Sequence, residues 1–504
     1  MLTFYECMMY IICMSKIKLT NEDREFFRLV SDAAAINPFS DERARIDRQI
    51  SGIHGADDRR QRIQLAIEAI RHHVSKLDAE GSCCFDDFSS KDRELMRYTF
   101  LFDVYHTFAE RFDAFIAQQE KTGNTPLKVD FGPELLKSLQ KRGFTHKEAL
   151  QYLAMFYQIR RAFYFIDRGL VGQSDCMRQL RMALWNNIFT YDIRDYERFM
   201  WDKMEDFSTL LEGPTGSGKG AAAAAIGRSG FIPYNPDKQA FESSFTGTFI
   251  PVNLSQFAES LLESELFGHV KGAFTGATGE HEGILSLCKP HGSIFLDEIG
   301  EISEPAQVKL LKVLEERTFT PVGSHKPRRF YGRVIAATNR PLDQLRADGA
   351  FRDDFYYRLC SDCIRVPSLA ERIRQNPDEL TDLVRYFCTQ ISDDENTELT
   401  DRVMDVITKQ LGGTAYGWPG NVRELAQCIR RVILKHSYEG HTPQARGRQD
   451  ELFNGIEAGT LTADEVLDRY CKILYDHYGT YEQVAKLTAL DRRTVKKRIQ
   501  NAEQ

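Results

Sequence analysis

The segment LLEGPTGSGKGAAAAAIGR at residues 210–228 limits the possible folds of this chain more than any other part. The run FSTLLE that leads into it is typical of a strand, and its alanine-rich end is a strong helix former. Glycines between a strand and a helix let backbone N–H groups converge, and the helix N-terminus favours an anion there. The spacing G-x-x-x-x-G-K therefore predicts a phosphate-binding loop rather than a chance glycine-rich turn. Its residues are Gly213, Pro214, Thr215, Gly216, Ser217, Gly218, Lys219 and Gly220.

A second segment, GSIFLDEIG at residues 292–300, complements this loop. Its apolar run ends in Asp297 and Glu298, which we expect at the carboxyl end of a strand. Asp297 is then placed to hold a nucleotide-bound Mg²⁺, and Glu298 to orient and deprotonate an attacking water. Gly220 stands where such loops usually carry Ser or Thr, so that hydroxyl ligand for Mg²⁺ is missing. A further strand, GRVIAATNR, ends in Asn339, which is placed to sense the γ-phosphate.

The spacing of apolar residues divides the chain of 504 residues into several parts. Spacings of three and four predict an all-α N-terminal domain. Short, wholly apolar runs that alternate with helices then predict an α/β fold with a parallel sheet covered on both faces. The runs are FSTLLEG, TFIPVNL, GSIFLDEIG, GRVIAATNR and CIRVPS. The predicted parts are a helical domain (1–165), an α/β domain (166–368), a helical region (369–438), a polar linker (439–457) and a small helical domain (458–504).

Composition excludes some classes of protein. A net charge of −7 argues against a chain that coats nucleic acid along its whole length, but it permits a local basic patch. We find no apolar run of the roughly 18 residues that span a membrane. The apolar start has no basic residue before it and no small-residue cleavage site, so we expect no signal peptide and a cytoplasmic protein. Met1 and Met14 both remain candidate starts.

The cysteines give a weak signal. There are 11, and only Cys360 and Cys363 have C-x-x-C spacing. A zinc or redox role is the alternative, but free thiols in a reducing compartment are the interpretation we favour.

The segment GHVKGAFTGATG at residues 268–279 combines glycines with an aromatic residue. A turn needs the glycines but not the Phe, and a core needs the Phe but not so much backbone freedom. We therefore expect an exposed loop whose tip presents Phe274 and Thr275 to a partner.

In this order, the motifs resemble those of the AAA+ ATPases. The string ESELFGHVKGAFTGA resembles the signature of bacterial sigma-54-dependent transcription activators, also called enhancer-binding proteins. The similarity covers residues 166–438 and extends to the C-terminus. It implies an α/β AAA+ core with a helical lid, ATP and Mg²⁺ as ligands, and sigma-54 RNA polymerase as a partner.

The resemblance also implies roles for individual residues. Phe274 and Thr275 would contact sigma-54, within the string Gly272, Ala273, Phe274, Thr275, Gly276 and Ala277. Asn253 would couple Glu298 to the γ-phosphate. The remaining implied residues are Val171 and Gly172 around the adenine, Arg352 and Arg358 as arginine fingers reaching the next subunit, and Arg423 on the nucleotide. The segment TFTPVGSHKPRRF would be a second insertion, a hairpin.

The end of the chain, YEQVAKLTALDRRTVKKRI at residues 481–499, predicts two short helices across a turn. It resembles the Fis-type helix-turn-helix of many such activators. Asp491 is a plausible N-cap for the second helix, and Ala489 occupies a turn position that favours Gly. The candidate DNA contacts are Arg492, Arg493, Thr494, Lys496, Lys497 and Arg498. A solvated basic helix without function is the alternative.

We therefore expect an ATP-hydrolysing activator that binds upstream DNA as a dimer and remodels the sigma-54 RNA polymerase closed complex as a homo-oligomeric, hexameric ring, without a membrane. The helical N-terminal domain would regulate it through a ligand that the sequence does not identify. One alternative is an AAA+ ring that remodels another protein or a nucleic acid. The other is a non-catalytic DNA-binding regulator that keeps ATP sites only to assemble.

Overall fold

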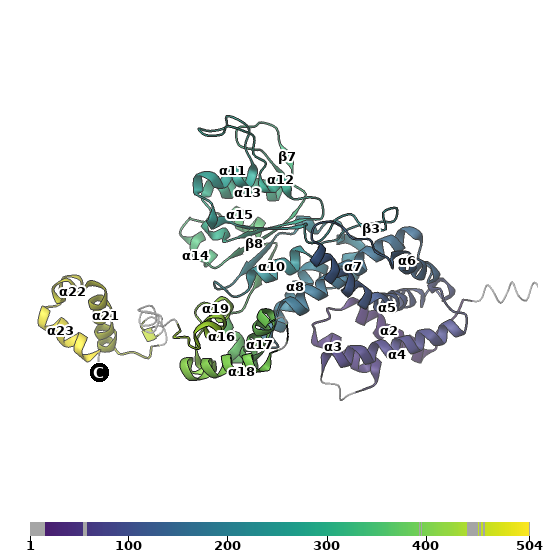
Figure 1. Cartoon of the computed structure of the whole chain (residues 1–504), viewed down its shortest axis with the longest axis horizontal. Helices are drawn as coiled ribbons and strands as arrows, with labels where there is room; N and C mark the ends of the chain where they lie inside the picture. Colours follow the sequence, from purple (N-terminus) through teal and green to yellow (C-terminus); the bar gives the residue numbers. More distant parts are fainter. Residues whose placement is uncertain are drawn as a thin grey trace, which may run out of the picture.

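The structure is a computed structural model that describes residues 16–53, 58–392, 394, 396–440, 452, 455–456 and 459–502 (Figure 1). Both candidate start residues and residues 441–450 of the expected linker lie outside this set. Among the described residues, none of the helices combines the length and apolar character required to cross a bilayer.

The N-terminal part is helical, as its apolar spacing predicts. Side-chain caps start several of these helices; Thr145, for example, forms a capping box with Glu148. The two longest helices, Arg93–Thr122 and His146–Gly169, contribute many aromatic side chains to the core between them. The elements are α2 (Asn21–Ala35), α3 (Asp41–Ser51), α4 (Arg59–Ala79), η1 (Phe85–Asp87), α5 (Arg93–Thr122), α6 (Gly132–Lys141) and α7 (His146–Gly169).

A five-stranded parallel sheet follows, in the order β4-β5-β8-β1-β9. All five strands were predicted from their continuous apolar runs: β1 (Thr209–Glu212), β4 (Phe249–Asn253), β5 (Ser293–Asp297), β8 (Arg333–Thr338) and β9 (Asp362–Arg365). Alternate residues of a strand enter different cores, so Leu211 belongs to the core shared with the N-terminal helices and Leu210 to the core on the opposite face. Both faces of the sheet are therefore covered, which explains why the strands lack polar alternation.

Short elements connect and surround the sheet. They are α8 (Asp175–Phe189), α9 (Ile193–Asp195), η2 (Tyr196–Met200), η3 (Met204–Asp206), α10 (Lys219–Gly227), β2 (Tyr234–Asn235), β3 (Ala240–Phe241), η4 (Leu254–Gln256), α11 (Glu259–Phe267), α12 (Ile284–Leu287), η5 (Ile299–Glu301), α13 (Glu304–Glu316), β6 (Thr318–Phe319), β7 (Arg328–Arg329), α14 (Leu342–Ala347) and α15 (Asp353–Leu359).

Two further helical groups complete the chain (Figure 1). The first has its own core around Leu380 and Leu425 and comprises α16 (Leu369–Gln375), α17 (Asp378–Ser392), α18 (Thr397–Val406), η6 (Ile407–Leu411), η7 (Gly413–Ala415) and α19 (Asn421–Lys435). The second packs around Val484 and Val495 and comprises α21 (Ala463–Tyr478), α22 (Tyr481–Thr488) and α23 (Arg492–Asn501).

The N-terminal helices and the sheet share one hydrophobic core. Helix α7 runs through the expected boundary at residue 165. Its Arg161 is fully buried and donates hydrogen bonds of 2.7 Å to the carbonyl oxygens of Arg228 and Gly230, which follow α10. Tyr157 stacks on Phe241 with ring centroids 3.9 Å apart. The helical domain is therefore packed directly onto the element that follows the phosphate loop, a contact that apolar spacing alone does not predict.

Candidate functional site

The phosphate loop connects β1 to α10, as predicted. Gly216 and Gly218 have φ angles of +77° and +107°, which residues with a Cβ rarely adopt. The Nζ of Lys219 donates to the carbonyl oxygens of Gly213 and Pro214 at 2.8 and 3.2 Å. Burial lowers the pKa of Lys219, and the nearby Glu298 and Asp297 carboxylates oppose that shift. The ammonium group thus lies inside the loop and faces two acids.

The two acids end strand β5. Glu298 has a left-handed backbone, φ 59° and ψ 46°, which costs a non-glycine residue about 1–3 kcal/mol. Its N–H donates to Oδ1 of Asp297 at 3.1 Å. Burial, followed by the charge of Asp297, raises the pKa of Glu298, which suits a carboxylate that must accept a proton.

Asn339 follows β8 and its Nδ2 donates to Oγ1 of Thr215 at 2.7 Å. The residue therefore reaches the phosphate loop from the neighbouring strand, as expected. Asn253 ends β4 beside Asp297 in the sheet register. Its Oδ1 accepts hydrogen bonds from the N–H and Oγ of Ser255, at 3.0 and 2.7 Å, so its side chain is engaged in its own turn.

These groups surround a cavity of about 350 Å³ between the sheet and the following helices. Its lining is Thr215, Gly216, Gly218, Lys219, Gly220, Ala221, Asp297, Glu298, Phe387, Val422, Arg423 and Ala426. Arg423 therefore lies in the same cavity as the phosphate loop.

The helical region is docked onto the phosphate loop. Nδ2 of Asn421 donates to the carbonyl oxygen of Thr215 at 3.0 Å, while its Oδ1 accepts from the N–H of Leu369 at 2.9 Å. A Cβ added to Gly216 would lie 2.4 Å from the carbonyl oxygen of Gly420. The sequence analysis did not identify Asn421. Its position directly after Gly420, at the start of α19, is the sequence signal that could have identified it.

Val171 and Gly172 lie outside the lining of this cavity. Nη2 of Arg372 donates to the carbonyl oxygen of Val171 at 2.5 Å and forms a buried ion pair of 2.7 Å with Glu379. Gly172 has φ +124°, and a Cβ there would collide with the Glu379 carboxylate. The segment before α8 is thus fixed to the helical region by a buried Arg–Glu pair that the sequence analysis did not identify.

Arg352 is the N-cap residue of α15, and Arg358 lies in the last turn of that helix. Arg352 forms ion pairs with Glu304 and Asp354 at 2.9 and 2.8 Å. Arg358 donates to the carbonyl oxygen of Leu314 through Nε and Nη2, at 3.1 and 2.9 Å. Neither side chain lines the cavity of its own subunit. Both are engaged within the chain, so an action on a neighbouring subunit requires them to exchange these partners.

The glycine-rich loop after α11 is exposed at its tip, as expected. Gly272 and Gly276 have φ angles of +82° and +103°, and the Gly272 N–H donates to the Ala277 carbonyl oxygen at 2.9 Å. Thr275 is exposed, while the Phe274 ring is 39% exposed and meets the His269 ring edge-on at 5.0 Å.

The predicted hairpin, β6–β7, lies directly beside this loop. Val270 donates to the Val322 carbonyl oxygen at 3.1 Å, and a Cβ on Gly323 would lie 2.8 Å from that of Ala273. Both loops project together from the upper edge of the α/β domain in Figure 1.

The C-terminal helices have the predicted turn. Asp491 caps α23 by accepting from the N–H groups of Arg493 and Thr494, at 2.9 and 3.0 Å, and Ala489 has φ 56°. Arg492 pairs with Glu482 at 2.9 Å.

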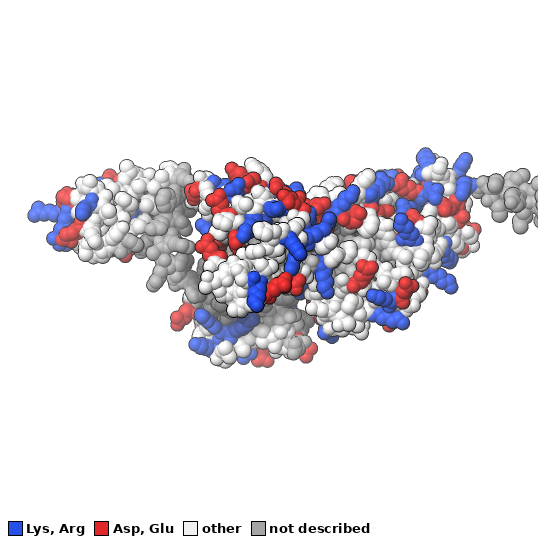
Figure 2. Space-filling view, turned by 90° about the horizontal axis from the view of Figure 1, so that it is seen from above, with Lys and Arg blue, Asp and Glu red and all other residues white. Residues whose placement is uncertain are grey.

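The basic side chains of α23 differ in their surroundings. Arg493, Lys496 and Lys497 are exposed, and Figure 2 shows Lys and Arg side chains projecting at this end of the molecule. Arg498 instead points to α21, where it pairs with Asp464 and Asp468 at 2.7 and 3.0 Å. Arg498 thus holds the helical unit together, and the exposed residues form its free basic face.

The cavity suits a nucleoside triphosphate with Mg²⁺. Loop N–H groups and Lys219 provide donors and positive charge for phosphates, and Asp297 provides a carboxylate of the kind that Mg²⁺ prefers. Because Gly220 has no hydroxyl, the remaining ligands of the ion would be phosphate oxygens and water. Among the described residues, no cluster of His, Cys, Asp and Glu forms a dedicated metal cage, and Cys360 and Cys363 are free thiols.

Two family models match the chain. The Sigma-54 interaction domain matches residues 194–365, and the AAA+ ATPase lid domain matches residues 374–446. The first covers the phosphate loop, the acid pair and the glycine-rich loop, and the second covers Arg423.

Curated relatives match the same region. Regulatory protein AtoC of Escherichia coli (strain K12) is 38% identical over 230 residues, which is 46% of each chain. The DNA-binding transcriptional regulator NtrC of Azospirillum brasilense is 38% identical over 272 residues, 54% of this chain and 49% of the relative. The crystal structure of NtrX from Brucella abortus covers 74% of this chain and 80% of its own, with a TM-score of 0.40 and 20% identity. The chain spans about half the length of the curated relatives it matches.

Proposed function

We propose that this chain, which belongs to the sigma-54-dependent AAA+ regulators through residues 194–365 and 374–446, hydrolyses ATP to remodel a sigma-54 RNA polymerase closed complex. The observation that carries the proposal is the joint placement of Lys219, Glu298 and Arg423 around one cavity. The same α/β domain presents Phe274 and Thr275 at an exposed loop tip.

The residues of the cavity divide the chemical work. Lys219 and the loop N–H groups neutralise and orient the phosphates. Asp297 would hold Mg²⁺, which when bound would supply positive charge to the phosphate oxygens. Glu298, with its raised pKa, accepts the proton of the attacking water. Asn339 is joined to the loop at Thr215, so a change in phosphate contacts reaches the end of β8.

Assembly would complete the site. We propose a homo-oligomeric ring, hexameric in this family, in which Arg352 and Arg358 stabilise transition-state charge in the adjacent subunit. A trans-acting arginine is worth about 10³–10⁵ in rate in other NTPases. Release of Arg352 from Glu304 and Asp354 would accompany ring closure, because those ion pairs occupy its guanidinium group in the single chain.

The glycine-rich loop at residues 268–279 and the neighbouring β6–β7 hairpin would transmit the effect of hydrolysis to sigma-54. The glycines at 272 and 276 permit the tip to change conformation, Phe274 offers an apolar contact and Thr275 a polar one. Through α23, a pair of chains would bind an upstream DNA site, with Arg493 and Lys496 facing the groove.

Reconstitution with purified components tests this function. The full chain, DNA with a sigma-54 promoter and its upstream site, and sigma-54 RNA polymerase should form open complexes only with hydrolysable ATP. Lys219→Ala should lose both hydrolysis and open complexes, whereas Lys238→Ala, an exposed lysine outside the cavity, should keep both.

Each alternative predicts a different result. Normal hydrolysis without open complexes on any sigma-54 promoter would favour a ring that remodels another partner. Absence of hydrolysis in an assembled, DNA-bound protein would favour a regulator that uses ATP only to assemble.

A further inference from the structure

A second cavity, of about 140 Å³ and partly open, lies between the N-terminal helices and residues 185–197, and the proposed chemistry does not use it. Its walls are mainly aromatic and aliphatic and come from helices far apart in the sequence. They are Ala34, Ile36, Pro38, Arg43, Ile63, Tyr98, Leu101, Phe102, Tyr105, His106, Tyr152, Met155, Phe156, Ile159, Arg160, Phe163, Trp185, Ile193 and Glu197. An engineered apolar cavity of about 150 Å³ in another protein binds benzene. The volume here therefore suits one six-membered ring.

The charged groups of the wall are already neutralised. Arg43 pairs with Asp47 at 2.8 Å, and Arg160 pairs with Asp113 at 2.5 Å. An anionic ligand would have to displace one of these carboxylates, because a buried anion needs a cationic partner and both guanidinium groups are already paired.

The other polar groups are neutral or occupied. Desolvation lowers the pKa of His106 well below its usual value, so its imidazole is neutral, with one donor nitrogen and one acceptor nitrogen. Glu197 accepts from the hydroxyl groups of Tyr98 and Tyr152. Together with the paired arginines, these groups favour an uncharged ligand.

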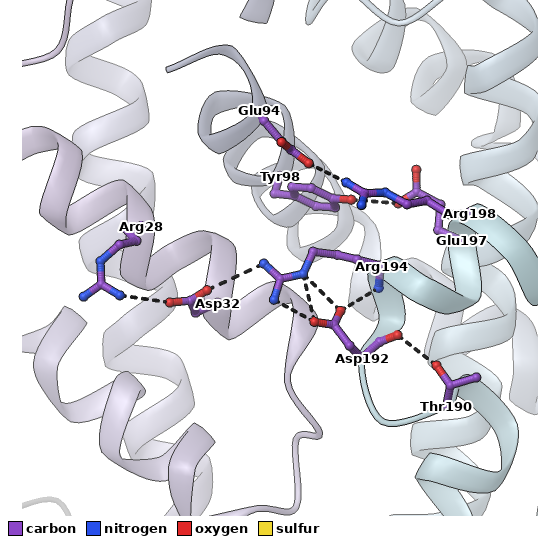
Figure 3. Close-up of polar contacts among 9 residues, drawn as sticks. All are labelled: Arg28, Asp32, Glu94, Tyr98, Thr190, Asp192, Arg194, Glu197 and Arg198. Atoms are coloured by element: carbon purple, nitrogen blue, oxygen red, sulfur yellow. Dashed lines mark hydrogen bonds and ion pairs between the residues drawn. The ribbon is translucent and has the colours of Figure 1, made fainter. Parts of the chain in front are cut away.

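One wall belongs to the segment that leads into the ATPase. We define Thr190–Met200 as the strap; its Ile193 and Glu197 line the cavity. Figure 3 shows how polar contacts hold the strap against α2 and α5. Arg194 lies 3.6 Å from Asp32, and Arg198 pairs with Glu94 at 2.6 Å.

The strap is linked in turn to the helix of the phosphate loop. Tyr196, fully buried beside Glu197, donates to Oε1 of Gln158 at 2.9 Å. Nε2 of Gln158 donates to the carbonyl oxygen of Ser229, which follows α10, at 3.0 Å. Gln158 lies on α7, the helix that also supplies Ile159 and Phe163 to the cavity. One helix therefore contacts both the cavity and the end of the element that begins at Lys219.

We propose that this cavity binds an uncharged compound of about one six-membered ring, and that its occupancy alters ATP hydrolysis through the strap and Gln158. The regulatory half of this proposal rests on the proposed ATPase function; the binding half does not. A ring-sized ligand would contact Ile193, Glu197 and the cavity face of α7. These belong to the strap and to α7, whose Tyr196 and Gln158 form the hydrogen-bonded chain to Ser229.

Binding is tested on the full chain by ¹⁹F NMR with fluorobenzene as the probe. We expect saturable binding with a Kd between about 10 μM and 1 mM, as befits a ligand with few heavy atoms. Ile159→Phe fills the cavity and should abolish binding of the probe. Ala34→Val is a smaller change that should weaken binding at least about fivefold, and it replaces the first variant in the test if Ile159→Phe disturbs folding. Ile53→Phe is the matched control, because Ile53 is 43% exposed and lies outside the wall.

Other binding results would overturn the assignment. Absence of saturable binding to the folded chain would reject the site, and so would unchanged binding in the folded Ile159→Phe and Ala34→Val variants. Benzoate that binds more tightly than fluorobenzene would reject an uncharged ligand.

Coupling is tested by ATP turnover with and without saturating fluorobenzene. We expect a change of about fivefold or more, the lower range of coupling between sites. Gln158→Met keeps the shape of the side chain but loses both hydrogen bonds, so it should retain probe binding and lose the change in turnover. Binding with unaltered turnover in the unmodified chain would overturn the coupling. Probe binding to a chain that never hydrolyses ATP would instead contradict the proposed function.

Discussion

Asn339 donates a hydrogen bond of 2.7 Å from Nδ2 to Oγ1 of Thr215, and this bond joins the end of strand β8 to the phosphate loop. Since Glu298 directly follows β5, the strand next to β8, the three groups lie at one edge of the sheet. A donor held in place before the reaction loses little free energy to reorganisation when phosphate charge develops.

We predict that Asn339→Ala lowers the rate of ATP hydrolysis about 100-fold, the size of effect seen when one positioned donor is removed from an active site. Nucleotide affinity should change little, because Lys219 and the loop N–H groups remain. Steady-state hydrolysis and fluorescent-nucleotide binding measure the two effects. Thr215→Ser keeps the hydroxyl acceptor and serves as the control; an equal loss in both variants would show that the hydrogen bond is not the cause.

Thr275→Ala should leave ATP hydrolysis intact and abolish open-complex formation. Thr275 is exposed and lies outside the lining of the nucleotide cavity, so ATP turnover should stay within about twofold, as for other exposed substitutions. Open-complex formation at a sigma-54 promoter should be lost. Thr278→Ala, in the same loop, is the control and should keep both activities. Promoter opening by the Thr275→Ala variant would show that Thr275 does not make the sigma-54 contact.

Reversal of charge on α23 should weaken DNA binding. Arg493→Glu with Lys496→Glu changes exposed side chains, and each lost phosphate contact should reduce the slope of log K against log salt by about 0.9. Filter binding or fluorescence anisotropy at several salt concentrations measures both affinity and slope. Arg469→Glu, exposed on α21, is the matched control, and equal affinities for the two proteins would exclude α23 as the binding surface.

Ala489→Gly should stabilise the C-terminal helices. Ala489 adopts φ 56°, a left-handed conformation that costs an L-residue about 1–2 kcal/mol and glycine much less. Glycine loses more conformational entropy on folding than alanine, so we expect the free energy of unfolding to rise by only about 0.5–1 kcal/mol. Amide hydrogen exchange in α23 should slow by about two- to fivefold. Faster exchange would show that the turn is not strained by alanine.

Much of the fold was predictable because it depends on local pattern. The strand ending at Asp297 is buried from Ser293 to Leu296, and its run of Ile, Phe and Leu reflects burial on both sheet faces. The Asp491 cap was likewise predictable, because capping acts within three residues.

Other features depend on packing between distant segments and could not be predicted. The contacts of Arg161 with the end of α10 join residues about 70 positions apart. Arg498 is one of the candidate DNA contacts in the basic cluster, yet α21 supplies two acids that turn it inward. The positions of Val171 and Gly172 depend on the buried Arg372–Glu379 pair, in which neither partner belongs to a recognisable motif.

The contact between Gly216 and Gly420 has a mechanical consequence. Here the two lobes of the cavity, the phosphate loop and the helical region, approach so closely that a Cβ on Gly216 would lie 2.4 Å from the Gly420 carbonyl oxygen and 2.9 Å from the Arg423 Cβ. Even one methyl group at position 216 would act as a wedge and hold the lobes apart. The approach of the phosphate loop to the helical region is therefore limited at this point by backbone atoms and the Cβ of Arg423, and not by the flexible end of a side chain.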